Sequence, residues 1–582
     1  MSLFEFLSLL GGLATFLFGM QVMGDALERR GGGKLKAILE NLTSSPLKGV
    51  LLGAGVTAII QSSSATTVML VGFVNSGIMR LSQAISVIMG ANIGTTMTSW
   101  LLSLTGIESE NVFVQLLKPS SFAPVLAVIG IIFIMFLKDS KKKDTGSILI
   151  GFSVLMTGME LMSSSVSGLK DNQAFTQVLT LFSNPVLGVL AGAVFTAIIQ
   201  SSSASVGILQ ALSTTGTVTY SNAIPIIMGQ NIGTCITAIL SAIGANKNAR
   251  RVSVVHLCFN IIGTVAFMIL FYAGKAIFDF AFVTNSIDAA GIAVVHTIFN
   301  VVATVVMLPF TKGLEKLSKI IIRDDEKDDT ESILDFRLLA TPSVAISQAK
   351  RVTNEMALVA KDSLINSLKL VGKYDGAEAE KIRKQEGMAD KYEDVLGTYL
   401  VKLSRESLSE GDSHEVSNLL HCIGDFERIS DHAVNIVESA EELKDKGIVF
   451  SPEAVREIDV MKAALTEILE NTYKAFENEN LEAAKKIEPL EQIIDKLKKK
   501  LRTNHILRLK DDACTIETGF IFSDLLTNFE RVADHCSNIA VCLLSIANDS
   551  FDTHEYLQHV KTDGGNDFRE TYESYKEKYS VN

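Results

Sequence analysis

The chain has 582 residues, of which 47% are hydrophobic and 20% charged, and its formal net charge is −12. Residues 1–322 carry 19 Lys+Arg and 13 Asp+Glu, whereas residues 323–582 carry 34 and 52. This asymmetry excludes a single uniform domain, and a net-negative chain without a basic face argues against nucleic-acid binding. The composition therefore predicts two unlike parts, of which the first is the more apolar.

The cysteines show neither a C-x-x-C pair nor the paired spacing of a disulfide framework or a zinc site. We expect them to be reduced and mostly structural. They are Cys235, Cys258, Cys422, Cys514, Cys536 and Cys542. The apolar N-terminus, residues 1–20, has no basic region and no small-residue cleavage site, so a removed signal peptide is not expected.

An internal repeat organises the first part of the chain. Adding 139 to a residue number aligns residues 12–99 with residues 151–238 without a gap. Two motifs recur at matching places. They are T-A-I-I-Q-S-S-S-A at Thr57–Ala65 and Thr196–Ala204, and M-G-x-N-I-G-T at Met89–Thr95 and Met228–Thr234. We therefore expect a membrane domain over residues 1–322, with repeat 1 at about residues 4–137 and repeat 2 at about residues 143–310.

Seven stretches are apolar and long enough to cross a bilayer as helices, which takes ~20 residues. They are Phe4–Leu27, Gln83–Leu104, Phe122–Leu137, Ser147–Val166, Asn222–Ile243, Ser253–Ala273 and Ala289–Pro309. The segments that hold Q-S-S-S differ, because Pro46–Ile60 and Ala65–Gly77 are short apolar arms joined by polar residues. Such a pair of arms predicts a re-entrant hairpin.

The loops that carry basic residues predict the orientation of these segments. With three crossings in each repeat, the second copy is inserted upside down, and every basic cluster then falls on the cytoplasmic side. The clusters lie at residues 29–36, 138–143, 247–251 and 312–319. An inverted repeat with interrupted helices is the plan of secondary transporters, whose sites lie near the midplane where the repeats meet.

The polar motifs inside the apolar segments predict the chemistry. Unpaired backbone groups at membrane depth are costly, so polar breaks are tolerated only beside protein or water-filled space. Q-S-S-S offers an amide, three hydroxyls and the N–H groups of the following half-helix, which suit an anion. Neutral hydroxyl and carbonyl oxygens are hard ligands of the kind that Na⁺ accepts. In G-x-N-I-G-T we expect the glycines to unwind the helix, so that Asn, Thr and freed carbonyls face the same cavity.

A packing role is the alternative for these residues, because Ser and Thr are common at interfaces between membrane helices. The duplication of the whole polar set at matching places favours a cavity instead. The sequence therefore predicts a cargo of one anion together with cations.

The doubled Q-S-S-S motif resembles the type II sodium/phosphate cotransporters, in which two such motifs lie in inverted repeats. The resemblance covers nearly all of residues 1–322. It implies a substrate and ion site that binds phosphate and Na⁺. The residues implied are Gln61, Ser62, Ser63, Ser64, Asn92, Thr95, Gln200, Ser201, Ser202, Ser203, Asn231 and Thr234.

A further signature of that family, H-x-x-F-N, occurs at His256–Asn260 and again at His296–Asn300. For the two histidines a helix-packing role and a site role stay open. The segment after the first repeat, Glu110–Val128, lacks this signature. Its absence leaves the Na⁺ stoichiometry and the electrogenicity of transport open.

The second part of the chain predicts a soluble, all-α region. An acidic linker at residues 323–337 is followed by patterns with a period of 3.6 residues, as in Val352–Leu370. F-E-R-I-S-D-H recurs as F-E-R-V-A-D-H, so this region is also duplicated, as two three-helix units. Carboxylates four residues apart lie on one helical face, and such pairs suit hard or intermediate metals. The candidate metal ligands are Glu386, Asp390, Glu427, Asp431, Glu491, Asp495, Glu530 and Asp534.

A solvated acidic face is the alternative for each of these pairs. Their arrangement over residues 338–548 resembles a PhoU domain, the regulator associated with phosphate uptake. The resemblance implies multinuclear sites for a divalent or iron-type metal. Residues 549–582 predict a polar tail without fixed structure.

Together these features predict an all-α protein: a polytopic membrane domain of two inverted repeats with re-entrant hairpins, followed by a PhoU-like pair of three-helix bundles. We expect Na⁺-coupled transport of inorganic phosphate across the inner membrane, regulated by a cytoplasmic PhoU-like domain. The expected partners are phosphate, the lipid bilayer and either a second copy of the chain or a regulatory protein. No nucleophile–base arrangement or phosphate-binding loop of an ATPase occurs, so an enzyme is not expected. The alternatives are a Na⁺-coupled carrier of another small anion, a phosphate exporter and a non-transporting membrane sensor of phosphate.

Overall fold

The computed structural model describes residues 2–40, 45–77, 79–106, 119–278, 280–323, 333–406, 408–511, 514–547 and 566–581. It forms two compact units, Met1–Val344 and Ala345–Asn582. In the described ranges the regular secondary structure is helical, apart from one isolated antiparallel bridge between Thr219 and Ser286. The predicted all-α class is therefore confirmed.

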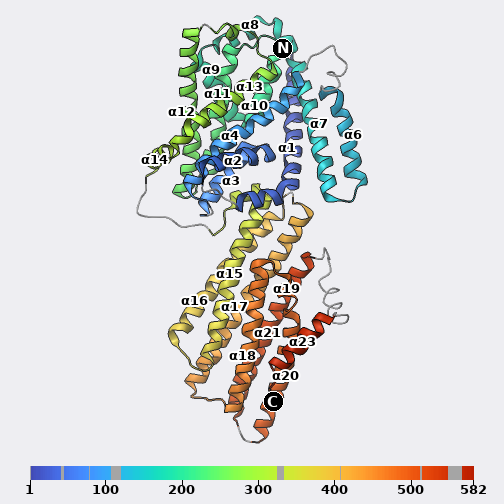
Figure 1. Ribbon diagram of the computed structural model, residues 1–582, viewed down its shortest axis with the longest axis vertical. Helices are drawn as coiled ribbons and strands as arrows, with labels where there is room; N and C mark the ends of the chain where they lie inside the picture. Colours follow the sequence, from blue (N-terminus) through green and yellow to red (C-terminus); the bar gives the residue numbers. More distant parts are fainter. Residues whose placement is uncertain are drawn as a thin grey trace. The chain divides into compact units, whose positions relative to one another are not determined.

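The first unit repeats one order of helices (Figure 1). In the first copy the helices are α1 (Leu3–Glu40), α2 (Pro46–Ile60), α3 (Ser63–Asn75), α4 (Leu81–Ser103) and α6 (Pro119–Phe136). In the second copy they are α7 (Ser140–Val166), α8 (Gln173–Leu181), α9 (Pro185–Ile199), α10 (Ser202–Ser213), α11 (Tyr220–Ser241) and α12 (Lys247–Phe278). Two more helices follow, α13 (Ala289–Met307) and α14 (Thr311–Ile321).

Six of the described helices are long and apolar enough to cross a membrane. They lie at Leu3–Arg30, Leu81–Ser103, Ser140–Lys170, Tyr220–Ser241, Lys247–Phe278 and Ala289–Ile321. The seventh predicted span, Phe122–Leu137, falls in a shorter apolar helix, Ser121–Phe136. The hairpin arms are also short helices, and α2 has the bounds that the sequence predicts.

Large apolar side chains cover much of the surface of this unit. Phe4, Met135, Phe136, Ile198 and Ile277 are each at least 69% exposed. In water such exposure would be costly, whereas lipid tails are as apolar as these side chains. The surface thus agrees with a membrane-embedded unit.

Glycines that recur in the repeat form the contacts between its helices. A Cβ atom at Gly19 of α1 would lie 2.3 Å from the backbone nitrogen of Leu155 in α7, and one at Gly158 would lie 2.4 Å from that of Phe16. In each copy a similar contact joins the first hairpin arm to the next long helix. A Cβ at Gly90 would lie 2.0 Å from a backbone oxygen of α2, and one at Gly229 would lie 2.0 Å from a backbone oxygen of α9. Small residues allow membrane helices to approach this closely.

The second unit contains two sets of three long helices. The first set is α15 (Pro342–Leu370), α16 (Gly376–Leu403) and α17 (Glu410–Asp445). The second is α18 (Pro452–Asn478), α20 (Ile487–Lys510) and α21 (Ile516–Ala547), with the short α19 (Leu481–Ala484) before α20. The two sets meet where α17 packs against α21.

The predicted polar tail is only partly described, and there it differs from the prediction. Residues 566–578 form helix α23 (Asn566–Lys578), which packs against α20. Tyr575 and Tyr579, four residues apart, are both 6% exposed, and the Tyr579 hydroxyl donates to Glu467. Two aromatic residues on one face bury enough apolar surface to hold a helix that is otherwise polar.

Candidate functional site

Both Q-S-S-S motifs form the same hairpin tip. The first arm, α2, ends in Gln61 with φ 59° and ψ 20°, and α9 ends in Gln200 with the same two angles. The next residue then caps the second arm. The Ser62 hydroxyl accepts from Ala65 N, and the Ser201 hydroxyl accepts from Ala204 N. In the described residues only one other non-glycine residue, Glu479, has a positive φ, so the strain is concentrated at the tips, as is common at functional sites.

The start of each second arm offers groups that suit an anion. The first turn of α3 and of α10 has backbone N–H groups without an intrahelical acceptor, at the positive end of the helix dipole. Ser63, Ser202 and Ser203 lie in these turns and are 5–7% exposed. Anions bind at such helix N-termini without further basic residues.

The two glutamines are not equivalent. The Gln61 amide nitrogen donates to Ala58 O at 2.6 Å, and its oxygen accepts from the Thr98 hydroxyl at 3.0 Å. Gln61 is therefore fixed to α2 and α4. Gln200 is exposed, and no side-chain bond of this kind holds it in the described structure.

Behind each tip a pair of hydroxyls joins the two arms. Thr57 donates to Thr66 at 3.0 Å, and Thr196 donates to Ser205 at 2.8 Å, with all four residues at most 1% exposed. None of these four residues is among the predicted site residues. Their place inside the duplicated T-A-I-I-Q-S-S-S-A motif could have identified them.

The G-x-N-I-G-T motifs do not break their helices, contrary to the prediction. Helices α4 and α11 run without interruption through Gly90–Thr95 and Gly229–Thr234. The reason is that these glycines serve close packing against the hairpin arms, as the contacts above show. Thr95 and Thr234 bond to the backbone of their own helices, at Ala91 O and Gln230 O.

The asparagines of these motifs pair with those of H-x-x-F-N. Asn92 Nδ2 lies 2.7 Å from Asn260 Oδ1, and Asn231 Nδ2 lies 2.7 Å from Asn300 Oδ1. Helix α12 thus provides the hydrogen-bond partner for the asparagine of the first motif, and α13 provides it for the asparagine of the second. The two repeats also interlock, because α3 packs against α11 and α12 while α10 packs against α4.

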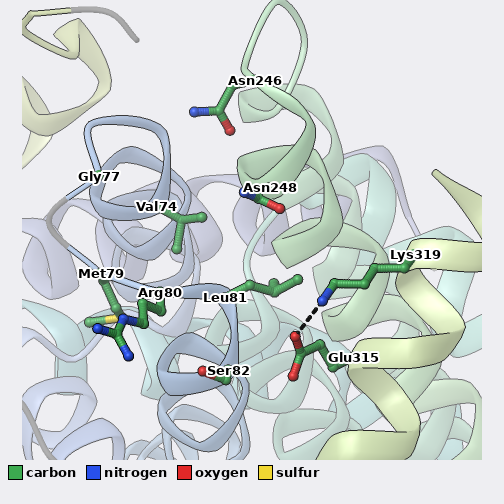
Figure 2. A pocket seen from close by; sticks show the side chains of 10 residues that line it. All are labelled: Val74, Gly77, Met79, Arg80, Leu81, Ser82, Asn246, Asn248, Glu315 and Lys319. Atoms are coloured by element: carbon green, nitrogen blue, oxygen red, sulfur yellow. Dashed lines mark hydrogen bonds and ion pairs between the residues drawn. The ribbon is translucent and has the colours of Figure 1, made fainter. Parts of the chain in front are cut away.

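One end of α3 is joined to repeat 2 by polar contacts. Asn246, which precedes α12, donates from its backbone nitrogen to Asn75 Oδ1 and from its amide to Asn75 O, both at 2.8 Å. Beside this contact lies a pocket of about 340 Å³. Figure 2 shows Lys319 in this pocket turned to Glu315, at 2.7 Å. No described residue of the predicted phosphate site lines the pocket.

Residues 334–340, which we call the latch, pack against the same end of α3. Leu334 and Leu338 are 2% and 0% exposed, and a Cβ at Gly72 of α3 would lie 2.6 Å from Leu338 Cδ2. Arg337 donates from Nε to Ser241 O at 2.5 Å and from Nη2 to Ile243 O at 3.0 Å, while Asp335 pairs with its Nη1. The part of the predicted linker after residue 333 is therefore packed on the first unit, and the acidic part at residues 324–332 lies outside the described residues.

In the second unit, three of the eight predicted metal ligands come together. One ligand oxygen each from Glu386, Asp390 and Asp431 lies within 4.8 Å of the other two. Burial, and next the Asp431 carboxylate, raises the pKa of Glu427 beside them to about 7. Carboxylate oxygens this close repel unless a cation intervenes, so the residues fit a hard metal ion.

The matching set in the second half is partly neutralised by lysines. Lys498 Nζ lies 2.7 Å from Glu530, and Lys499 Nζ lies 2.7 Å from Asp495. The first half has Glu393 and Asp394 at the equivalent positions. In the first half Arg428 lies 3.3 Å from Asp431, so the two predicted clusters differ in which carboxylates have a basic neighbour.

Two histidines in the duplicated segments were not predicted as part of a site. His432 and His535 face each other between α17 and α21, with ring centroids 5.7 Å apart. His432 Nδ1 bonds to Asn528 Oδ1 and His535 Nδ1 to Asp425 Oδ1, both at 2.8 Å. Their recurrence in F-E-R-x-x-D-H was the available signal.

Comparison with known proteins agrees with both resemblances. Residues 15–164 and 154–291 match the family model of the Na⁺/Pi-cotransporter, and residues 353–440 and 458–543 match that of the PhoU domain. The N-terminal region is thus of the Na⁺/Pi-cotransporter family, and the C-terminal region holds two PhoU domains.

Several relatives share these regions. YjbB of Escherichia coli (strain K12), named as a candidate inorganic phosphate export protein, is 25% identical over 94% of this chain and 99% of its own length. Sodium-dependent phosphate transport protein 2A of Rattus norvegicus is 26% identical over 30% of this chain and 26% of its own length. The crystal structure of PhoU from Pseudomonas aeruginosa is 18% identical, covers 36% of this chain and 98% of that chain, and gives a TM-score of 0.31. The candidate membrane helices, together with YjbB and the rat transporter, indicate a membrane protein of phosphate transport.

Proposed function

We propose that this protein carries inorganic phosphate across the inner membrane by alternating access, coupled to Na⁺. The two hairpin tips bind phosphate and Na⁺ through Gln61–Ser64 and Gln200–Ser203, with Asn92, Thr95, Asn231 and Thr234 beside them. The observation that carries this proposal is the identical build of the tips. Each has a left-handed glutamine followed by a capping serine and a helix N-terminus.

Sodium coupling is supported by the family model and by the rat relative, whose name states sodium dependence. Neutral oxygens from serine, threonine and asparagine are the donors present, and they suit a monovalent hard cation. The positive-inside distribution of basic loops supports a cytoplasmic second unit.

Phosphate export is a second candidate, favoured by the full-length similarity to YjbB. Both candidates use the same tips, and the gradients decide the direction of net flux. A carrier of another anion, such as sulfate, would also fit a helix N-terminus.

Regulation by the second unit is supported by the latch. The latch contacts α3 and the end of α11, and two residues after it the chain enters α15. A change in the PhoU domains that moves the start of α15 would act on the latch through this short covalent connection.

The test is flux in proteoliposomes that contain the full-length protein. We expect phosphate uptake that depends on an inward Na⁺ gradient and is lost when K⁺ replaces Na⁺. Reversing the gradient should give efflux, and excess sulfate should not compete. Flux without Na⁺ dependence, or competition by sulfate at equal concentration, would contradict the proposal.

A further inference from the structure

The buried asparagine pairs have hydrogen bonds that fix the direction of each amide. Asn260 Nδ2 donates to His256 O at 2.9 Å and to Cys235 Sγ at 3.4 Å, so its oxygen must face Asn92. Asn92 therefore donates from Nδ2, and its Oδ1 points elsewhere. Asn92 is 8% exposed and Asn260 is 1% exposed.

No described residue donates to Asn92 Oδ1. This oxygen is not among the fully buried polar atoms that lack a partner, so it keeps some accessible surface although Asn92 as a whole is 8% exposed. This oxygen is held in place by the bond to Asn260 rather than by a bond of its own. It is available to a ligand that needs an electron pair.

The second pair forms a closed ring of hydrogen bonds. Asn300 Nδ2 donates to His296 O at 2.8 Å, and Asn231 Nδ2 donates to Asn300 Oδ1. His296 Nε2 then lies 3.2 Å from Asn231 Oδ1. Because the Asn231 nitrogen is committed to Asn300, the atom facing His296 is the oxygen, and His296 Nε2 carries the proton. His296 Nδ1 has no hydrogen-bond partner in the described structure, as this tautomer allows.

The repeats thus differ at equivalent positions. The same distance of 2.7 Å joins each pair, but in the described residues only Asn231 has its oxygen bonded to a histidine ring. His256 occupies the position in α12 that His296 has in α13, yet no described bond joins its ring to Asn92. The two repeats therefore have the same asparagine pair but differ in whether the side-chain oxygen of Asn92 or Asn231 accepts a hydrogen bond.

We infer that Asn92 gives its amide oxygen to the coupled alkali cation, with Asn260 as its positioning residue, whereas Asn231 is a structural residue held by Asn300 and His296. This inference rests on the proposed Na⁺ coupling and refines it: repeat 1 supplies an asparagine ligand to the cation and repeat 2 does not. A neutral amide oxygen is a suitable ligand for a hard monovalent cation, and no charge change is needed.

The experiment compares Asn260→Leu with Asn300→Leu in the full-length protein. Each removes a 1%-exposed asparagine and leaves one amide nitrogen without its acceptor, so the main losses are matched, and Asn260→Leu removes in addition only the 3.4 Å contact with Cys235 Sγ. We expect Asn260→Leu to raise the Na⁺ concentration for half-maximal phosphate uptake by about fivefold or more, equivalent to about 1 kcal/mol. Asn300→Leu should lower the amount of folded protein to a similar degree with the Na⁺ half-saturation near that of the wild type.

A second measurement covers variants that fold but do not transport. The melting temperature of the purified protein is recorded against Na⁺ concentration, with K⁺ as control, and Asn260→Ser and Asn300→Ser replace the leucine variants if these fail to fold. The Na⁺-dependent rise should need more Na⁺ in the Asn260 variant alone. Equal shifts in both variants, a shift only for Asn300, or no shift in either would overturn the inference. A wild type without Na⁺ dependence would instead overturn the proposed function.

Discussion

A glutamine in the left-handed region begins each Q-S-S-S tip. At φ 59° the side chain meets its own backbone, which costs a non-glycine residue on the order of 1–3 kcal/mol. This strained conformation occurs at both Gln61 and Gln200. The turn brings the N–H groups of the second arm to the tip of the hairpin, and the following serine caps that arm.

The first prediction concerns the capping serines. Ser62→Ala and Ser201→Ala each remove the acceptor of a backbone N–H and a hydroxyl at the tip. The lost cap costs about 1 kcal/mol, which a large membrane unit tolerates, so the amount of protein in the membrane should stay near that of the wild type. The phosphate concentration for half-maximal uptake should rise several-fold.

Ser213→Ala is the matched control, since its hydroxyl bonds to Gln210 O at the other end of α10. This variant should transport like the wild type. Unchanged phosphate affinity in both tip variants would remove the serines from the site.

At the scale of the elements, glycine contacts join the two copies. Because the glycines at 12 and 19 are those aligned with 151 and 158, α1 and α7 use equivalent surfaces on each other. The periodic glycines of the repeat are thus explained by helix packing, and the same explanation applies inside G-x-N-I-G-T.

The second prediction follows from the difference between two glycines of α1. Gly19→Ala puts a Cβ 2.3 Å from the backbone nitrogen of Leu155, and separating the helices should cost about 1–3 kcal/mol. Gly11→Ala meets nothing within 4 Å and should be neutral or slightly stabilising. Thermal melting of the two purified variants measures this. A Gly19→Ala protein as stable as Gly11→Ala would show that α1 and α7 do not pack as described.

The third prediction concerns the latch. Arg337→Ala removes both bonds to the carbonyls at the end of α11, and Gly72→Ala displaces Leu338 from α3. Since the proposed alternating access requires the hairpin arm to move against the other repeat, we expect both variants to transport faster at saturating phosphate. Initial rates in proteoliposomes measure this change.

Arg351→Ala is a suitable control, because the bonds of this arginine within the described residues are to Glu355, at an exposed place on α15, and to the nearby Gln348. It should leave the rate unchanged. Slower transport in both latch variants would mean that the latch supports the fold and does not restrain movement.

At the scale of the whole molecule, the features that could be predicted from the sequence are those that the internal repeat makes visible. The doubled Q-S-S-S between short apolar arms predicted two hairpins of the same build, and the structure has a pair of short helices at each. Contacts between different helices could not be predicted in this way. The spacing of H-x-x-F-N does not indicate that Asn92 bonds to a residue of α12 and Asn231 to a residue of α13. The expected break in α4 and α11 was wrong because a glycine-rich motif permits close packing as readily as unwinding. The latch was missed because its few apolar residues follow an acidic run.

The two carboxylate clusters of the PhoU domains also differ although their sequences are duplicated. In the first cluster the carboxylates of Glu386, Asp390 and Asp431 lie together, and the pKa of Glu427 is raised by its own burial and next by the nearby Asp431 carboxylate. In the second, Lys498 and Lys499 already supply positive charge. In the first cluster Arg428 lies 3.3 Å from Asp431, but no ion pair within the described residues reaches Glu386 or Asp390. A metal ion therefore gains more by binding to the first cluster, where it relieves the repulsion that remains, than to the second, where it must displace two ammonium groups.

The fourth prediction is that metal is held mainly by the first cluster and that its loss changes transport. The triple variant Glu386→Gln, Asp390→Asn, Asp431→Asn should lose most of the bound metal, measured by mass spectrometry on full-length protein purified without chelators. The equivalent triple, Glu491→Gln, Asp495→Asn, Asp534→Asn, should keep it. Phosphate flux at several internal phosphate concentrations should change in the first variant and keep its Na⁺ dependence, because the proposed Na⁺ sites lie in the other unit. Equal metal loss in both variants would contradict the role given to the lysines. Metal loss with unchanged flux at every phosphate concentration would show that the metal does not regulate transport. The latch would then be the remaining support for regulation by this unit.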